Sequence, residues 1–252
     1  MPAGTVRTAG VDLASRDDRT ALAEISWSAA GAVLESVTMG VGNDRIIAVA
    51  DDVALIGIDC PLGWPRPFTD LLLAARAGAV APDAGSTAAQ KQALAYRRTD
   101  SEVRIATGHW PLSVSADRIA YPAMRCAGLL GRLASNGHRV RRSGVDSCVA
   151  EVYPAAALRR WNVPTTGFKT DPAARAELVQ RLVGLTPWLD WSGFVGLCAE
   201  QDDALDAVVC AMVAGAVVRG RTSRPATDLV ELANEEGWIH LPDTDFLHDP
   251  VG

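Results

Sequence analysis

The stretch CAEQDDALDAVVCAMVAGAV, residues 198–217, decides the fold, because it predicts the start of a helix that is buried in the core. From Leu205 onward its residues are almost all Ala, Val, Leu and Met, so this part of the helix has no polar face for solvent. Asp203 and Asp206 nevertheless occupy its first turns, three residues apart, with Asp202 beside them. Residues three apart lie on the same helical face. We therefore expect a core helix that begins with a pair of carboxylates on one face.

The composition of the whole chain is that of a folded globular protein. Its 252 residues are 48% hydrophobic and 21% charged, which excludes global disorder. The formal net charge of −6 argues against a protein whose entire surface grips nucleic acid, although a local basic groove is compatible with it.

The cysteines, the first residues and the longest apolar run predict a cytoplasmic protein without a membrane span. The five cysteines are odd in number and include no C-x-x-C pair, which is typical of a reduced protein with neither a disulfide framework nor a thiolate zinc site. Residues 1–14 contain no apolar segment of the kind found in export signals. The apolar run 205–218 is shorter than the ~20 residues needed to cross a bilayer.

The order of the expected elements predicts a mixed α/β fold. Three closely spaced runs, 5–13, 20–27 and 31–41, indicate an antiparallel meander, and the apolar run 53–61 indicates a strand buried on both faces. Another buried strand is expected at 147–154, a last edge strand at 238–242, helices at 44–52, 68–78, 116–135, 154–161, 172–183 and 228–237, and loop with a short helix at 79–115. Strands first in hairpins and then alternating with helices are typical of such folds.

Acidic residues end three of these strands. Asp12 ends the first strand, Asp59 ends the fourth, and Glu151 lies at the end of the fifth. In an open α/β sheet the carboxyl ends of the strands gather at one edge, where ligands bind. Together with Asp203 and Asp206 of the core helix, four or five carboxylates are therefore expected to converge.

Converging carboxylates repel one another unless some are protonated or a cation lies between them. Oxygen ligands without His or Cys suit Mg²⁺ or Mn²⁺, and two such ions ~3.5–4 Å apart can promote phosphodiester cleavage. Each acid also has an ordinary explanation: Asp202 as a partner of the helix dipole, Asp12 and Asp59 as turn formers. The combination favours a site, because Gly10 and Gly57 stand two residues before the strand-end acids and leave room for a close backbone approach.

The sequence resembles an uncharacterised prokaryotic family, a domain-of-unknown-function group of predicted nucleases with the ribonuclease H fold. The matching segments are GVDLA (10–14), IGIDCPLG (56–63), RRTDSEVR (97–104), AEVYPAAAL (150–158), FKT (168–170) and DDALDAVVCAMVA (202–214). The DALDA segment is also similar to the helix of Holliday-junction resolvases that completes a metal site with two acids three apart. The resemblance implies a ribonuclease H-like mixed five-stranded sheet, three strands antiparallel and the rest parallel, flanked by helices. It also implies a single domain over residues 1–252, with a basic loop and helical insertion at about 64–136.

The resemblance further implies roles for individual residues. The implied metal ligands are Asp12, Asp59, Asp203 and Asp206, with Glu151 as a fifth catalytic acid, and the implied phosphate contacts are Arg98, Asp100, Arg104 and Lys169. The family usually has an aromatic hydroxyl before the lysine, where this chain has Phe168.

Residues 91–142 add a basic segment that the resemblance does not supply. They hold ten basic and three acidic side chains, a local charge of +7 in an acidic protein. One interpretation is a surface that binds the nucleic-acid backbone through residues such as Arg97 and Arg98, with Trp110 and Tyr121 stacking on bases. The other is a solvated arginine-rich helix face with core aromatics.

Three functions follow from these observations. The leading hypothesis is a nuclease that uses Mg²⁺ or Mn²⁺ to cleave DNA or RNA by a two-metal mechanism. An alternative is a phosphotransferase or ATPase of the related actin-like architecture, but the turn ASRDDR (14–19) has no glycine, and its acids Asp17 and Asp18 would repel phosphates. The third is a non-catalytic module that binds nucleic acid or a protein on the same fold.

Overall fold

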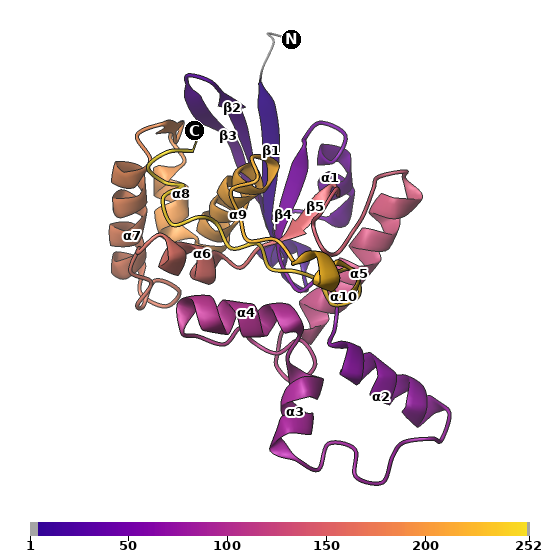
Figure 1. The fold of residues 1–252 in the computed structure, drawn as a ribbon. Helices are drawn as coiled ribbons and strands as arrows, with labels where there is room; N and C mark the ends of the chain where they lie inside the picture. The colour runs from indigo at the N-terminus through magenta and orange to yellow at the C-terminus, as the bar shows by residue number, and fades with distance from the viewer. Residues whose placement is uncertain (1–4, 251–252) are drawn as a thin grey trace.

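The computed structural model of the protein describes residues 5–250 and shows a mixed six-stranded sheet covered by helices on both faces (Figure 1). The strands are β1 (Val6–Asp12), β2 (Ala21–Ser28), β3 (Gly31–Met39), β4 (Leu55–Asp59), β5 (Val149–Glu151) and β6 (Leu189–Asp190). The helices are α1 (Asn43–Val49), α2 (Arg66–Arg76), α3 (Ala88–Ala95), α4 (Arg98–Thr107), α5 (Ala120–Ser135), α6 (Pro154–Arg160), α7 (Pro172–Leu185), α8 (Val195–Glu200), α9 (Asp202–Val218) and α10 (Val230–Glu236). Short 3-10 turns lie at Asp17–Arg19 and Thr227–Leu229.

The sheet runs in the order β5-β4-β1-β2-β3-β6, with β1 near its centre. The hairpin strands β1, β2 and β3 are antiparallel, as the meander predicts, whereas β4, β5 and β6 each join parallel to a neighbour. In the parallel pair β1–β4, Asp12 lies opposite Asp59 and Gly10 lies opposite Gly57. The two strand-end acids are thus side by side on neighbouring strands.

Helix α9 packs directly on β1, β2 and β4, and it has almost no exposed residue. A side chain on Gly10 would place its Cβ 2.1 Å from the Ala207 carbonyl oxygen, and one on Gly57 would place it 2.5 Å from the Cys210 carbonyl oxygen. The predicted close backbone approach at these glycines is therefore confirmed. The Thr8 hydroxyl adds a tie from the same face of β1 by donating to the Ala211 carbonyl at 3.0 Å.

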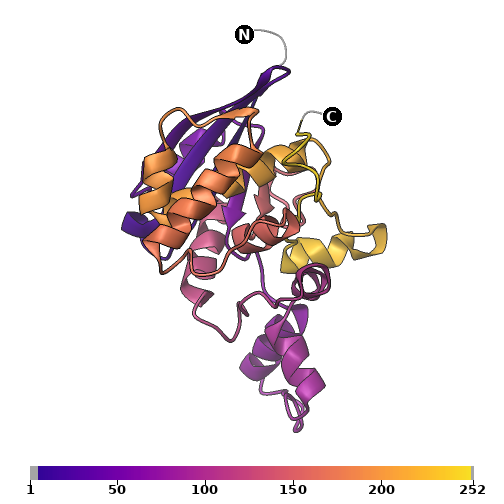
Figure 2. The same cartoon turned by 90° about the vertical axis from the view of Figure 1, so that its left-hand side faces the viewer.

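The two faces of the sheet carry different helices. Helices α7 and α8 lie in the layer with α9, and Figure 2 shows this layer in front of the strands. The opposite face is covered by α1 and α5, whose Ile46 and Leu129 join Val11 and Ile58 in a second apolar cluster. The core thus has an apolar layer on each side of β1 and β4.

Helices α2 and α3 form an arm that projects away from the sheet (Figures 1 and 2). Neither helix contains a buried residue, and Leu72 and Leu73 of α2 are exposed. The predicted insertion is therefore divided: residues 66–95 make the arm, whereas α4 and α5 pack on the body.

The structure differs from the expected strands in two places. The sheet has six strands instead of five, because the two-residue strand β6 pairs with β3 after α7. Such a short strand has no periodic pattern that a sequence could reveal. Residues 238–242 do not form the expected edge strand; Ile239 makes a single bridge to Glu151, and Pro242 makes one to Thr222.

The expected helices also need two corrections. Region 79–115, expected to be loop with one short helix, contains two helices, α3 and α4. The stretch 198–217 is not one helix, because extended backbone at Gln201 separates α8 from α9, which begins at Asp202. Within residues 5–250, no helix combines the length and the apolar character needed to span a bilayer.

Candidate functional site

A pocket of about 330 Å³ opens at the carboxyl ends of β1, β4 and β5. Asp12, Asp59 and Glu151 line it, and Lys169 joins them from the loop before α7. The strand-end acids therefore meet at one edge of the sheet, as the general rule for open α/β sheets predicts.

Asp12 and Asp59 are held close together against their mutual repulsion. Burial, followed by the charge of Asp59, raises the pKa of Asp12 well above its ordinary value. Burial, followed by the charge of Asp206, raises the pKa of Asp59 to about 8. A site that raises the pKa of neighbouring acids in this way also favours a cation or a proton between them.

Asp206 of α9 completes this group and is only 1% exposed. The Lys169 ammonium donates a hydrogen bond to its Oδ2 atom, whereas Oδ1 is buried and has no partner within residues 5–250. Burial raises the pKa of Asp206 to about 6, although Lys169 opposes the shift. For Lys169 itself, burial lowers the pKa, but the charge of Asp206 outweighs that effect and the pKa is raised. Buried polar atoms are nearly always satisfied, so the free Oδ1 atom needs an explanation.

The other two acids of α9 have partners of their own. Arg19 holds Asp203 with two hydrogen bonds, from Nε at 2.9 Å and from Nη2 at 3.2 Å. Asp202 lies 3.8 Å from the Lys169 ammonium. Both oxygens of Asp203 are thus occupied, which sets it apart from Asp206.

Glu151 belongs to a buried ion-pair network. Arg97, which is 2% exposed, donates from Nη1 and Nη2 to the two oxygens of Glu151 at 2.8 and 2.7 Å. The same guanidinium binds Asp100 at 2.9 Å, and the Leu62 amide donates to Glu151 at 2.9 Å. Every oxygen of Glu151 therefore has a partner, so this lining residue fixes the pocket wall and offers no free oxygen.

This network corrects two expectations about phosphate binding. Arg97 and Asp100 are buried and bound to each other, so neither presents a free donor to a phosphate. Arg98 and Arg104 lie on the exposed side of α4, where Arg98 pairs with Glu102 at 2.5 Å. Of the predicted phosphate contacts, only Lys169 lies in the pocket with a substantially exposed side chain, at 47%.

The basic segment 91–142 is likewise less free than its charge suggests. Five of its ten basic side chains are in ion pairs, namely Arg97, Arg98, Arg125, Arg132 and Arg139. Arg125 is mostly buried and ties α5 to the loops that follow β1 and β3 through the Ala14 and Val41 carbonyls. Trp110 packs against Tyr96 in a tilted arrangement with ring centroids 4.3 Å apart, whereas Tyr121 is exposed.

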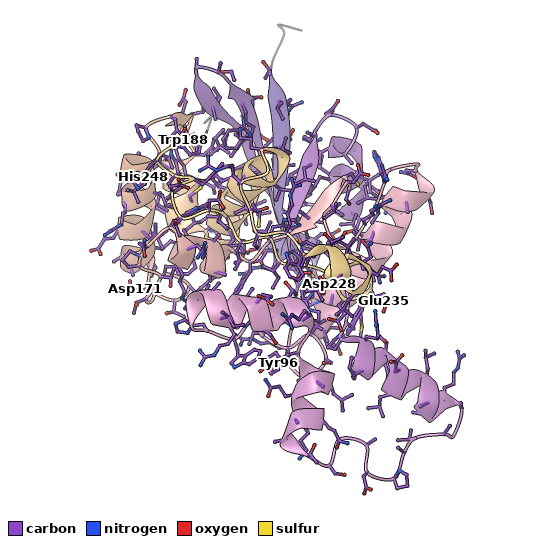
Figure 3. All side chains as sticks on the ribbon, viewed as in Figure 1. Tyr96, Asp171, Trp188, Asp228, Glu235 and His248 are labelled. Carbon is purple, nitrogen blue, oxygen red and sulfur yellow. The ribbon has the colours of Figure 1, made fainter. Side chains whose placement is uncertain are left out.

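Sequence reasoning missed Glu236, which lies at the end of α10. Its carboxylate accepts from the Arg66 amide at 2.7 Å and from the Arg98 amide at 2.9 Å, so one side chain caps the first turns of both α2 and α4. Neighbouring Glu235, which is labelled in Figure 3, pairs with the Arg66 guanidinium. No local pattern points to Glu236, because the amides that it caps lie 170 and 138 residues away.

The donors suit a hard divalent cation, although no ligand set is complete. Within residues 5–250, no group of three or more His, Cys, Asp or Glu side chains is arranged to hold a metal ion. Asp12, Asp59 and the free oxygen of Asp206 are nevertheless all hard oxygen donors. Mg²⁺ is commonly bound by one or two carboxylates, with water and substrate phosphate as the other ligands. The oxygen donors of these three residues therefore fit Mg²⁺ or a similar ion.

Comparison with known proteins identifies a family and no individual relative. The family described as "Protein of unknown function (DUF429)" matches residues 10–229. No curated protein and no solved structure matches the chain.

Proposed function

We propose that this chain, which belongs to the DUF429 family, is a nuclease that uses Mg²⁺ or Mn²⁺ to hydrolyse phosphodiester bonds. The observation that carries the proposal is the carboxylate group at the sheet edge. Asp12 and Asp59 are register neighbours in the pocket, and the nearby charge of Asp206 acts on both. One buried oxygen of Asp206 has no partner among the described residues. A bound cation relieves their repulsion and gives that oxygen a partner.

The arrangement of the sheet supports a ribonuclease H-like fold as part of this proposal. Without β6, the strand order is β5-β4-β1-β2-β3, with an antiparallel meander and two added parallel strands. Helix α9 crosses β1 and β4 and brings its first turns to the strand ends. This is the arrangement that the resemblance to predicted nucleases implies.

Each residue of this group then has a defined task. Asp12, Asp59 and Asp206 would hold the divalent ions, which when bound would neutralise charge at the scissile phosphate and lower the barrier to attack by water. Lys169, whose side chain is half exposed, orients Asp206 and would offer a remaining ammonium hydrogen to a phosphate oxygen of the substrate. Asp203, held by Arg19, is an outer acid that positions the start of α9. Glu151 positions the pocket wall through Arg97.

Metal binding and cleavage test the proposal together. We expect Mn²⁺ titrated into the protein to bind with millimolar or tighter affinity in calorimetry, and Asp12→Asn to abolish that binding. With Mn²⁺ present, a panel of single-stranded, duplex, hybrid and junction substrates is expected to yield at least one that the protein cleaves and the variant does not. Metal binding without cleavage of any substrate would favour a non-catalytic module, and absence of both would refute the proposal.

The actin-like alternative finds no support in the turn after β1. That turn contains a 3-10 helix in which Asp18 pairs with Arg16 and Asp17 pairs with Arg125. Its acids, rather than backbone amides of glycines, occupy the position where such proteins cradle a phosphate.

A further inference from the structure

Two chemically different sets of residues line the pocket. The strand ends and the loop before α7 contribute Asp12, Asp59 and Lys169, whereas the connection between α4 and α5 and the first turn of α5 contribute apolar residues, namely Leu112, Ile119 and Pro122. Its volume of about 330 Å³ is at the small end of the range for ligand pockets, ~300–1,000 Å³. A pocket of this size can hold one monomer of a polymer. The monomer should have a charged part that faces the acids and Lys169 and an apolar part that faces the apolar residues.

The apolar side is a braced loop and not a loose lid. Leu112 and Ile119 belong to the connection between α4 and α5, and Pro122 follows in the first turn of α5. In the connection, the Ser113 hydroxyl donates to the Ala95 carbonyl at 2.6 Å and the Ser115 hydroxyl donates to the Leu94 carbonyl at 2.7 Å. The tilted aromatic pair Tyr96–Trp110 anchors the same loop at its start (Tyr96 is labelled in Figure 3). The wall is therefore held in place before any ligand arrives, which lowers the cost of binding.

Leu112 is the exposed part of this wall. It lines the pocket and is 45% exposed, so a flat apolar ligand placed there removes its surface from water. A nucleobase has such a face, but in a duplex that face is covered by its stacked neighbours and only the base edges remain accessible in the grooves. A paired base therefore cannot use this wall.

From these features we infer that the pocket takes an unpaired nucleotide, with its base against the Leu112 wall and its phosphate toward Lys169 and the carboxylates. The inference rests on the proposed nuclease function and names its substrate class as single-stranded or frayed nucleic acid. The base side is uncharged, whereas the acids repel a phosphate until a cation is bound. An uncharged nucleoside should consequently bind to the metal-free protein.

Nucleoside binding tests the base site without requiring catalysis. We expect saturation-transfer NMR in chelator to detect binding of adenosine, guanosine, cytidine or thymidine to the wild-type protein. Leu112→Asp should weaken that binding at least fivefold. Leu73→Asp is the matched control, since Leu73 is 57% exposed on α2 and does not line the pocket. Absence of transfer to every nucleoside, or equal binding by Leu112→Asp, would overturn the inference.

Cleavage with Mn²⁺ separates this inference from the proposed function. A single strand should be cut at least tenfold faster than the same sequence closed into a hairpin duplex, and Leu112→Asp should lose most of that preference. Equal cleavage of both substrates would refute the base site and leave the nuclease proposal intact. Failure to bind Mn²⁺ and to cut either substrate would refute the nuclease, while nucleoside binding would still decide whether the pocket holds a base.

Discussion

At the scale of single residues, the candidate site depends on which groups neutralise the buried charge of Asp206. The side chain is fully enclosed, one oxygen is bound by Lys169, and the other oxygen has no partner among the described residues. Burial nevertheless raises the pKa of Asp206 to about 6 despite the nearby ammonium. The carboxylate is thus incompletely compensated in the metal-free protein, which gives its removal an unusual expected effect.

Asp206→Asn should have different effects on the stability of the metal-free and the metal-bound protein. In chelator we expect the free energy of unfolding to be unchanged or to rise by up to about 1 kcal/mol, because a costly buried charge is lost. The rise in melting temperature on adding Mn²⁺ should fall sharply, because a ligand is lost. Asp202→Asn serves as the control and should change neither quantity. Destabilisation of Asp206→Asn in chelator, with no effect of Mn²⁺ on the wild type, would identify Asp206 as a structural partner of Lys169.

The acids also predict how stability depends on pH. The pKa of Asp59 is raised from 3.8 to about 8, so between these values the folded chain binds a proton that the unfolded chain releases. Stability of the metal-free protein should therefore fall as pH rises from about 4 to about 8. We expect Asp59→Asn to reduce the loss of stability between pH 5 and pH 8 by up to about 4 kcal/mol, because one differentially bound proton is worth about 1.4 kcal/mol per pH unit. Urea titrations in chelator measure this, and parallel pH profiles for wild type and variant would contradict it.

At the scale of the elements, Gly10 and Gly57 place the carboxylates. Both glycines lie on the face of β1 and β4 that meets α9, two residues before Asp12 and Asp59. Since the helix backbone fills the space of their missing side chains, the start of α9 is drawn against the strand ends. The same contact therefore builds the core and brings Asp206 to the pocket.

Gly10→Ala should disrupt this packing, because its Cβ would lie 2.1 Å from helix backbone atoms. We expect a loss of about 3 kcal/mol or more in the free energy of unfolding, which is large for an added methyl group. Gly131→Ala is the control, since Gly131 lies inside α5 with open space around it. Alanine there should stabilise the helix by up to about 1 kcal/mol. Similar melting temperatures for Gly10→Ala and wild type would show that α9 can shift outward.

Glu236 joins two elements in a similar way, by capping α2 and α4 with one carboxylate. Glu236→Ala should cost about 2 kcal/mol, the sum of two lost caps of about 1 kcal/mol each. Glu235→Gln removes only the exposed pair with Arg66 and should stay within about 0.5 kcal/mol of wild type. Urea denaturation of the two variants compares the effects, and equal stabilities would show that solvent replaces the caps.

The helices and strands that place the acids were predictable because they obey local rules. The Gly-x-Asp strand ends and the apolar helix with acids in its first turns are each recognisable from a short local stretch of sequence. Ion-pair partners are not predictable from local sequence. Arg97 pairs with Glu151, 54 residues away, and half of the basic side chains in segment 91–142 are in ion pairs. The two-residue strand β6 and the projection of the arm of α2 and α3 away from the sheet were also not predicted, because both depend on tertiary contacts and not on hydrophobic periodicity in the sequence.

At the scale of the whole molecule, stability is unevenly distributed. The body has an apolar layer on each side of the sheet, whereas the arm of α2 and α3 contains no buried residue. Amide hydrogens of α2 and α3 should therefore exchange with solvent orders of magnitude faster than those of α9, as mass spectrometry can measure. Equal protection would mean that another surface covers the arm in solution.

The position of α9 along the chain has a consequence for how the protein is made. The helix binds β1 across 203 residues, as in the bond from Thr8 to Ala211. While the ribosome synthesises the chain, the α9-facing side of β1 stays uncovered until the 203 residues that follow Thr8, up to Ala211, have been made. Contacts so distant in sequence slow folding, and uncovered strands are prone to aggregate. Newly made protein should therefore need a chaperone more than its size suggests, and nascent chains that stop before residue 202 should lack the carboxylate pocket.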